Sequence, residues 1–269
     1  MTQETFQLSG SAAAIYEEQK VPAIFSPLAE ATLDAVPLFD DDSILDIACG
    51  TGIVARKARE RVGPSARIVG VDLNEGMIDA ARNLGDSHSQ SCEWRTADVT
   101  KLPFEDGTFS VAFCQQGLQF FPDQELALRE IKRVLRPGGR IALTVWSETS
   151  ALFKALAEAL RRHVNDEVAE RLLAPFASPG ADALGSLVSE QGFGDISAQV
   201  LAVERVLGDP ENAIPKEIMG TPVGPAVLER GDAVMRQIVD EVMEALSGYR
   251  RGSHFAYPTH THLIRAKVR

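Results

Sequence analysis

A bend of small residues near position 50 is the first place where the residue types suit ligand binding. The segment ILDIACGTGIVA (44–55) joins an apolar run, the acid Asp46, small residues and the start of a helix. Gly50 and Gly52 let the backbone approach a ligand closely, and a helix that begins there offers free N–H groups and the positive end of its dipole. The loop suits a nucleotide-like ligand, although GTGIVA also satisfies the G-x-G-x-x-A fingerprint of dinucleotide-binding proteins.

A second acid follows at the end of the next apolar run. Asp72 closes ARIVGVD (66–72), where a carboxylate can accept hydrogen bonds from both hydroxyls of a ribose. The alternative is a strand-end acid that caps the following helix. Both NAD-dependent enzymes and methyltransferases place an acid here, so the bend and Asp72 leave the two classes open.

The elements that must position these residues alternate between strand and helix. Asp123 stands at an N-cap position, and the other boundaries come from hydrophobic periodicity and turn residues. Strands are expected over 43–48, 66–72, 92–98, 109–115 and 140–146, and helices over 9–36 (interrupted by Pro22 and Pro27), 52–62, 75–85 and 122–135. The alternation is typical of right-handed βαβ units and predicts an α/β fold with a doubly wound, mostly parallel sheet.

Past Trp146 the alternation is less regular. The remaining segments are predicted as helical inserts over 148–195 and 208–250, a sixth strand over 196–207, and a seventh, antiparallel strand over 254–268. Inserts after the carboxyl ends of strands lie beside the ligand crevice of such sheets, so 209–248 is a predicted lid, with a purely structural cap as the alternative. The chain, 1–269, is expected to form one domain, with a helical cap over 1–40 and a cofactor-binding core over 41–147.

Composition narrows the partners and the compartment. The net charge of -11 opposes binding to phosphate backbones and anionic lipid heads, so nucleic acid and membrane surfaces are poor partners. The three cysteines lack CxxC spacing, which argues against a disulfide framework or a zinc site. Neither a basic-then-apolar leader nor an apolar run of membrane-spanning length is visible, and we predict a cytoplasmic protein.

The stretch TADVTKLPFEDGTFSVAFCQQGLQFFPDQELALREIKRVLRPGGRIALTVW (96–146) separates the two enzyme classes. Together with the bend and Asp72, it resembles the class I S-adenosylmethionine-dependent methyltransferases, particularly the small-molecule subgroup of ubiquinone and menaquinone biosynthesis. The resemblance covers about 40–147, carries four motifs in order, and implies a Rossmann-like methyltransferase fold with S-adenosylmethionine as cofactor. A dinucleotide-dependent oxidoreductase does not account for Asp98 followed by LPFEDGTF, or for PGG before the fifth strand.

The resemblance also implies a role for each cofactor-site residue. Asp72 corresponds to the ribose carboxylate, and Asp98 to the acid that accepts a hydrogen bond from the adenine amino group, unless Asp98 is an ordinary turn residue. The remaining implied contacts are the first-motif residues Asp46, Ala48 (a glycine in many members), Cys49, Gly50 and Gly52 at the methionine part, Leu73 and Met77 near the adenine, the Val99 backbone at a ring nitrogen, and the Gln115 carbonyl at the cofactor's amino group. For Gln116 and Gln119 the alternative is that they are simply exposed polar residues.

Methyl transfer from a sulfonium requires mainly placement, because the methyl group is already activated and the site must hold the acceptor in line and dry. If the last strand is antiparallel, it starts at the ligand edge, which brings His254 and Tyr257 near the site and leaves His260 and His262 further away. We predict His254 as the general base where the acceptor needs one, a surface histidine being the alternative. Side chains expected to wall an apolar acceptor pocket, or else to pack in the core, are Tyr16, Phe25, Phe120, Trp146 and Tyr257.

The predicted function is therefore S-adenosylmethionine-dependent methyl transfer to the O, C or N atom of a small, partly apolar metabolite. Two alternatives stay open, an NAD(P)-dependent oxidoreductase and a non-catalytic S-adenosylmethionine-binding subunit. No metal site is predicted, because the H-x-H pair of His260 and His262 has no evident third ligand. The expected partner is a small-molecule methyl acceptor, and nothing in the pattern fixes an oligomeric state.

Overall fold

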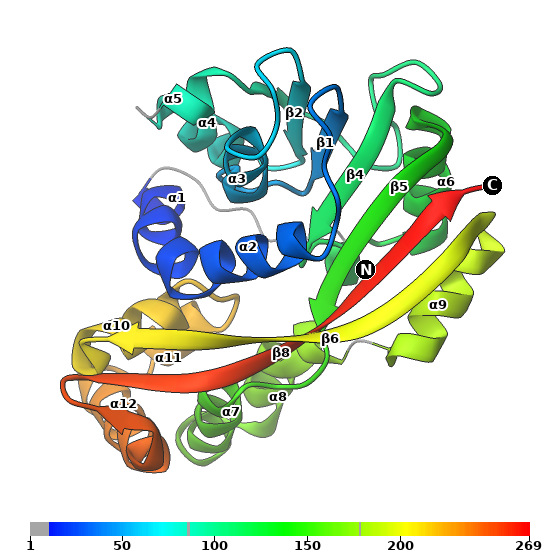
Figure 1. Cartoon of the computed structure of the whole chain (residues 1–269). Helices are drawn as coiled ribbons and strands as arrows, with labels where there is room; N and C mark the ends of the chain where they lie inside the picture. The colour runs from blue at the N-terminus through cyan, green and yellow to red at the C-terminus, as the bar shows by residue number, and fades with distance from the viewer. Residues whose placement is uncertain (1–10, 85–86, 178) are drawn as a thin grey trace. The chain divides into compact units, whose positions relative to one another are not determined.

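The computed structural model describes residues 11–84, 87–177 and 179–269 (Figure 1). The chain forms two compact units. Unit 1 comprises Met1–Ser147, Pro179–Leu201 and Thr261–Arg269, and unit 2 comprises Glu148–Ser178 and Ala202–His260. The single-domain organisation expected from the sequence stays a prediction.

An eight-stranded sheet in the order β3-β2-β1-β4-β5-β8-β6 organises the fold, with the short β7 paired to β8. Its strands are β1 (Ser43–Ile47), β2 (Arg67–Asp72), β3 (Glu93–Thr96), β4 (Phe109–Gln115), β5 (Leu135–Trp146), β6 (Phe193–Gly208), β7 (Arg250–Arg251) and β8 (His254–Val268). Strands β1 to β5 pair in parallel, and β8 runs antiparallel to β5. The predicted α/β fold is confirmed, and β7 adds an eighth strand because two residues are too few to give a periodic signal.

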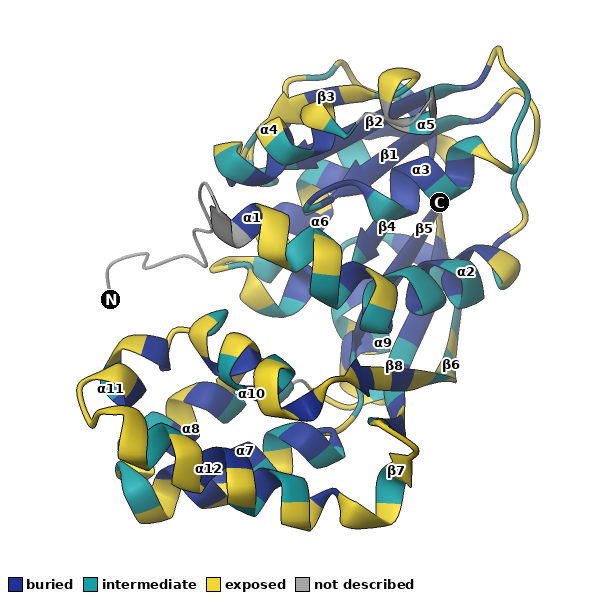
Figure 2. Ribbon diagram, turned by 90° about the vertical axis from the view of Figure 1, so that its left-hand side faces the viewer, coloured by how far each residue is buried: buried dark blue, intermediate teal, exposed yellow. Residues whose placement is uncertain are grey.

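The parallel strands β1, β2 and β4 of unit 1 are buried along most of their length, and the sheet has helices on both faces (Figures 1 and 2). Leu45 packs in a cluster with residues of α6 and α9, whereas its neighbour Ile44 packs with residues of α2, α3 and α4. These helices are α2 (Ser26–Asp34), α3 (Ile53–Arg59), α4 (Glu75–Asn83), α6 (Gln124–Val134) and α9 (Ala181–Glu190). Successive strand residues point to opposite faces, so near-continuous apolar strands give two cores, as doubly wound sheets require.

The first described segment of the chain is helical without a break at either proline. It consists of α1 (Ser11–Ile15), a π-helix η1 (Tyr16–Phe25) and α2. Pro22 lies inside the π-helix and Pro27 in the first turn of α2, where a missing N–H costs little. The interruptions expected at these prolines are therefore wrong, and residues 9 and 10 of that prediction lie outside the described residues. Hydrogen bonds of the i→i+5 type bring residues four or five apart onto one helix face, which matters for Tyr16, Lys20 and Phe25 below.

Most other predicted elements are present with shifted ends. The helix expected over 52–62 is shorter, and β5 begins at Leu135, before the PGG turn rather than after it. Asp123 is the N-cap of α6, because its side chain accepts a hydrogen bond from the Leu126 N–H (2.8 Å). Short elements complete unit 1, namely α5 (Ser87–Gln90) and the 3-10 turn η2 (Leu118–Phe120).

Unit 2 is built from most of the two predicted inserts. Its helices are α7 (Ala151–His163), α8 (Asp166–Leu173), η3 (Ala174–Phe176), α10 (Pro210–Met219), α11 (Gly224–Leu228), α12 (Asp232–Ala245) and η4 (Ser247–Tyr249). They enclose an apolar core together with Phe255 and Tyr257 of β8. Across residues 11–84, 87–177 and 179–269, none of the helices has the length and apolar composition needed to cross a bilayer.

Candidate functional site

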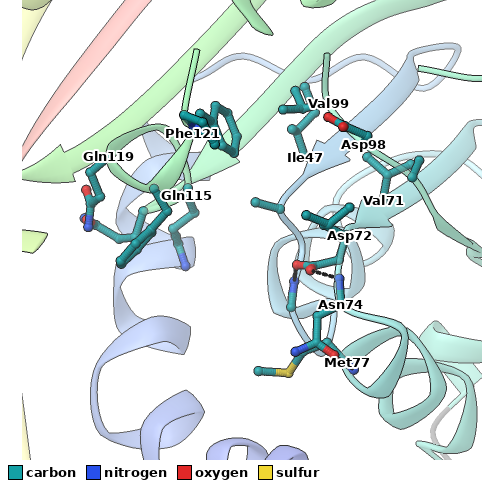
Figure 3. Close-up of a pocket in the computed structure, with 18 of the residues that line it drawn as sticks. Ile47, Val71, Asp72, Asn74, Met77, Asp98, Val99, Gln115, Gln119 and Phe121 are labelled. Atoms are coloured by element: carbon teal, nitrogen blue, oxygen red, sulfur yellow. Dashed lines mark hydrogen bonds between the residues drawn. The ribbon is translucent and has the colours of Figure 1, made fainter. Parts of the chain in front are cut away.

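A cavity of about 470 Å³ lies in unit 1 at the carboxyl ends of the parallel strands. The strand order reverses between β1 and β4, and doubly wound sheets bind ligands at such a switch point. Figure 3 shows Asp72, Met77 and Asp98 on one side of this cavity and Gln115 and Gln119 on the other. The sequence-predicted residues that line it are Tyr16, Phe25, Ala48, Gly50, Asp72, Leu73, Met77, Asp98, Val99, Gln115, Phe120 and Trp146.

The bend after β1 turns through left-handed backbone conformations. Ala48 has φ of 52° and Gly50 has φ of 56°. For a residue with a side chain this region costs about 1 to 2 kcal/mol, so Ala48 carries strain that the glycine of many family members avoids. Between them, the Cys49 N–H donates to the Val71 carbonyl (3.0 Å), which ties the bend to β2.

Asp72 fastens the same bend from the end of β2. Its Oδ2 accepts a hydrogen bond from the Gly50 N–H, and its Oδ1 accepts one from the Asn74 N–H, both at 2.8 Å (Figure 3). Burial raises the pKa of Asp72, against the lowering effect of these backbone hydrogen bonds. A carboxylate oxygen has two lone pairs, so each oxygen can accept one further donor such as a ribose hydroxyl. The side chain of Asn74, rather than that of Asp72, caps α4.

Three of the implied cofactor residues lie behind the cavity lining. Asp46 is buried, its Oδ2 accepts a hydrogen bond from the Ala55 N–H (3.0 Å), and burial raises its pKa to about 7. Cys49 packs in the apolar cluster between the sheet and helices α2 to α4. Gly52 has φ of 88°, and a Cβ there would collide with the ring of Trp94. These residues shape the bend from beneath, because their side chains or Cα atoms face the protein interior.

Asp98 and Val99 follow β3 at the cavity. Asp98 is exposed, and its Oδ1 accepts hydrogen bonds from the N–H (2.8 Å) and the hydroxyl (2.7 Å) of Thr100. Asp98 therefore holds a turn and also lines the cavity. Met77, from the first turns of α4, is buried, and Leu73 is partly exposed at the same side of the cavity.

The opposite side of the cavity comes from the end of β4 and the loop that follows it. Gln115 donates from Nε2 to the Phe25 carbonyl (3.1 Å). Gln116 has φ of 56° and is only 7% exposed, so the alternative of an exposed polar residue is wrong for Gln116. Gly117 lies so close to the first bend that a Cβ on it would approach the Ala48 Cβ to 2.6 Å. The two strained bends, after β1 and after β4, thus pack against each other at the switch point.

Sequence reasoning missed several lining residues on this side. They are Lys20, Gln116, Gly117, Gln119, Phe121, Pro122, Asp123 and Leu126, and on the other side Asn74 and Thr100. The Gln-Gln-Gly run at the end of a buried strand is the one signal that could have located them, because polar residues there face the ligand edge of the sheet. The spacing of Tyr16, Lys20 and Phe25 could not have done so, since it fits a π-helix and not the α-helix expected there.

The predicted aromatic residues divide between the cavity and a core. The Tyr16 and Phe25 rings stack 5.2 Å apart, and burial together with the Asp72 carboxylate raises the pKa of the Tyr16 hydroxyl. Tyr257 is instead fully buried in the apolar core of unit 2, with its ring 5.9 Å from that of Tyr249. Of the two positions considered for Tyr257, the pocket wall is therefore wrong and the core is right.

The histidines lie on β8, which has the predicted bounds but extends past the end of its partner β5. Thr261 is the residue of β8 that pairs with Trp146 at the carboxyl end of β5. His254 pairs with Arg251 of β7, much earlier in β8, so the antiparallel direction alone does not bring it to the sheet edge. His260 contacts Glu148 in unit 2 (Nδ1 to Oε1, 2.5 Å), and the use of His254 as a base stays a prediction.

Comparisons with known proteins agree with this geometry. A family model described as "Methyltransferase domain" matches residues 45–143. The ubiquinone/menaquinone biosynthesis C-methyltransferase UbiE of Hahella chejuensis is 38% identical over 119 residues, 44% of this chain and 48% of the relative. The enzyme of the same name from Pseudomonas fluorescens is 33% identical over 181 residues, 60% of this chain and 71% of the relative. The chain belongs to the class I S-adenosylmethionine-dependent methyltransferases.

Solved structures share the fold at low sequence identity. The YcgJ protein of Bacillus subtilis superposes with a TM-score of 0.60 and 18% identity, covering 90% of this chain and 97% of that one. In sequence, by contrast, the methyltransferase chain spans about half the length of the first curated relatives it matches. These findings give no support to an oxidoreductase.

The cavity of this methyltransferase suits the cofactor of its class, S-adenosylmethionine. Its volume falls within the range of roughly 300 to 1,000 Å³ for small-molecule sites. Asp72 offers spare lone pairs beside the bend, and Asp98 keeps its second oxygen for a donor. The prediction of the cofactor is confirmed, and the contacts assigned to single residues stay predictions.

Proposed function

We propose that the chain transfers the methyl group of S-adenosylmethionine to an O, C or N atom of a small, partly apolar metabolite. The observation that carries the proposal is the difference between the two sides of one cavity. One side offers carboxylates and the strained bend after β1, and the other offers carboxamides and the rings of Phe120 and Phe121. A site for a charged cofactor and a neutral acceptor needs this asymmetry.

The cofactor would be held by groups that the bend fixes in place. Asp72 accepts hydrogen bonds from the ribose hydroxyls, Asp98 and the Val99 backbone meet the adenine, and Met77 packs against the ring. Gly50 and the carbonyl of Gln115 lie toward the methionine part. Bound S-adenosylmethionine supplies a methyl group activated by its sulfonium, so the chain has mainly to orient the acceptor and exclude water.

The acceptor is inferred from the lining and from the names of the relatives. Tyr16, Phe25, Phe120 and Trp146 contribute aromatic surface to the cavity. The relatives named above carry the name of a ubiquinone/menaquinone biosynthesis C-methyltransferase, which agrees with a small, partly apolar acceptor. A molecule of that kind matches aromatic walls with a few polar groups between them.

A general base is required only where the acceptor does not ionise readily. His254 is the proposed base, with residues 209–248 as a lid that excludes water. His254→Ala should then lower kcat while leaving cofactor affinity unchanged, because the variant has no imidazole to take the proton of the acceptor. Wild-type turnover of that variant across the pH range would remove His254 from the reaction.

The first experiment measures ligand class and activity in the same preparation. We expect S-adenosylhomocysteine to bind in calorimetry and NADH to give no heat. Incubation with labelled S-adenosylmethionine and reduced 1,4-naphthoquinone should give a methylated product. Methyl transfer would exclude a non-catalytic subunit, whereas binding of NADH in place of S-adenosylhomocysteine would refute the proposal.

The partners and compartment follow from composition. The net charge of -11 favours a small-molecule partner over nucleic acid. No disulfide joins the three cysteines, two of which are buried, which suits a reducing compartment, and we place the protein in the cytoplasm.

A further inference from the structure

The amide of Gln116 is held in one orientation by a relay of two hydrogen bonds. The hydroxyl of Thr261, in β8, donates to the Val145 carbonyl of β5 at 2.6 Å. A hydroxyl has one proton, so Thr261 can only accept from Gln116, whose Nε2 lies 2.5 Å away. The amide nitrogen therefore faces Thr261, and Oε1 is turned away from it.

Gln116 Oε1 has no hydrogen-bond partner among the residues that the structure describes. The residue lines the cavity and is more than nine-tenths buried, so bulk water does not readily supply the missing donor. An unpaired buried acceptor costs about 1 to 3 kcal/mol. The left-handed φ of 56° adds strain of the same order, and such strained polar residues cluster at functional sites.

The neighbouring carboxamides repeat the pattern. Gln115 Nε2 is bound to the Phe25 carbonyl, and Gln115 Oε1 is buried without a partner. Gln119 lines the same side, and both of its amide atoms are buried without partners. The carboxamides of this side thus present three acceptor oxygens without a partner among the described residues against one such amide nitrogen, which favours a ligand with an O–H group.

From this we infer that Gln116 is a positioning residue for the methyl acceptor, whose O–H group donates to Gln116 Oε1. The inference rests on the proposed function and narrows it to neutral, hydroxyl-bearing acceptors such as phenols and enols. The relay through Thr261 makes the oxygen available in advance, so the acceptor hydroxyl is bound without reorienting the amide.

The test compares a phenol with its methyl ether, in which a methyl group replaces the hydroxyl hydrogen. Protein saturated with S-adenosylhomocysteine is titrated with 1-naphthol and with 1-methoxynaphthalene, which keeps the ring and the oxygen but has no O–H. We expect 1-naphthol to bind about tenfold more tightly, as for one hydrogen bond to a buried acceptor. Equal affinities would overturn the inference.

Gln116→Met removes the oxygen and keeps the length of the side chain. Its affinity for 1-naphthol should fall about tenfold, to that of the ether, while its affinity for the ether and for S-adenosylhomocysteine stays within twofold. Gln124→Met is the matched control, because the Gln124 amide donates to the Leu118 carbonyl and does not line the cavity. A parallel loss of S-adenosylhomocysteine affinity in Gln116→Met would assign the oxygen to the cofactor and overturn the inference.

Thr261→Val covers the case in which Gln116→Met does not fold. It lies outside the cavity lining and removes the hydroxyl that orients the amide. We expect a loss of about threefold in 1-naphthol affinity, because the freed amide spends part of its time reversed. No change would overturn the relay. Failure of the wild type to bind S-adenosylhomocysteine would instead contradict the proposed function, so the two failures are distinguishable.

Discussion

On the β1–β3 side of the cavity the carboxylate of Asp72 is held by backbone N–H groups, whereas on the β4 side the amide of Gln116 is held by the hydroxyl of Thr261, far away in sequence. The first arrangement needs only one acid and a bend with the right backbone angles. The second needs side chains from strands that meet only in the folded sheet. The difference suggests why one side serves a cofactor common to a large family, while the other can change with the acceptor.

The largest effect on the β1–β3 side of the cavity is expected at Gly52, which lies beneath the bend after β1. Gly52→Ala should lower the free energy of unfolding by about 4 kcal/mol, through a collision with the Trp94 ring added to the left-handed φ of 88°. Gly138→Ala is the control, since Gly138 has a φ of 72° with nothing within 4 Å, and should cost about 1 kcal/mol. Urea titration measures both. Similar losses in the two variants would show that packing on Trp94 does not set the bend.

The buried acid beneath the bend gives the next largest effect, and it depends on pH. Because burial raises the pKa of Asp46 to about 7, the folded state holds its proton more tightly than the unfolded state does. Stability from this group is therefore present at low pH and is lost as pH rises toward 7, by about 2 to 3 kcal/mol between pH 5 and 8. Asp46→Asn cannot titrate and should flatten this slope, as measured by urea unfolding at the two pH values.

Asp79→Asn provides the comparison for that slope. Asp79 lies exposed on α4 and pairs with Arg82. Its replacement should leave the pH dependence of the wild type unchanged. A slope that survives in Asp46→Asn would move its origin to another buried group, of which Asp72 is the nearest candidate because burial raises its pKa as well.

Removal of the Asp72 carboxylate should affect ligand binding on the β1–β3 side of the cavity without affecting the fold. Asp72→Ala should weaken S-adenosylhomocysteine binding at least tenfold in calorimetry, since it removes both the ribose acceptors and the anchors of the Gly50 and Asn74 N–H groups. Near-ultraviolet circular dichroism should remain that of the wild type. Unchanged affinity would reject the ribose assignment, and Asp79→Ala serves as the surface control.

The same contrast explains how far the sequence could lead. The strands, the bend and the acid at the end of β2 were predictable, because apolar periodicity and short-range spacing determine them. The lining role of Asp98 was predictable only from the family resemblance. The burial of Gln116 was not predictable, since its hydrogen bond to Thr261 joins residues of β4 and β8 that no local pattern connects.

Two further misses have local causes. Pro22 was expected to interrupt a helix, but the chain accommodates it in a π-helix, which also turns Phe25 toward the cavity. Tyr257 was placed near the ligand on the assumption that β8 starts at the sheet edge. The strand is long, and its pairing with Trp146 occurs at Thr261 instead. Periodicity predicts that a strand exists but not how far it extends past its partner.

The smallest effect is expected at Asp98. Its replacement tests whether the β1–β3 side of the cavity recognises the adenine amino group. Asp98 is exposed, and its Oδ1 already serves Thr100, so water screens and replaces much of any ligand contact. Asp98→Asn keeps the oxygen for Thr100 and should weaken S-adenosylhomocysteine binding only about threefold. The informative quantity is selectivity against S-inosylhomocysteine, in which a carbonyl oxygen replaces the adenine amino group.

The wild type should prefer S-adenosylhomocysteine, because the carboxylate accepts from an amino group and repels a carbonyl. In Asp98→Asn the amide can donate to that carbonyl, so the preference should shrink or reverse. Thr100→Val tests the turn alone, since it removes only the hydroxyl that donates to Asp98. If it reproduces the loss of selectivity, the turn controls recognition of the base; if only Asp98→Asn changes the preference, the carboxylate itself reads the adenine.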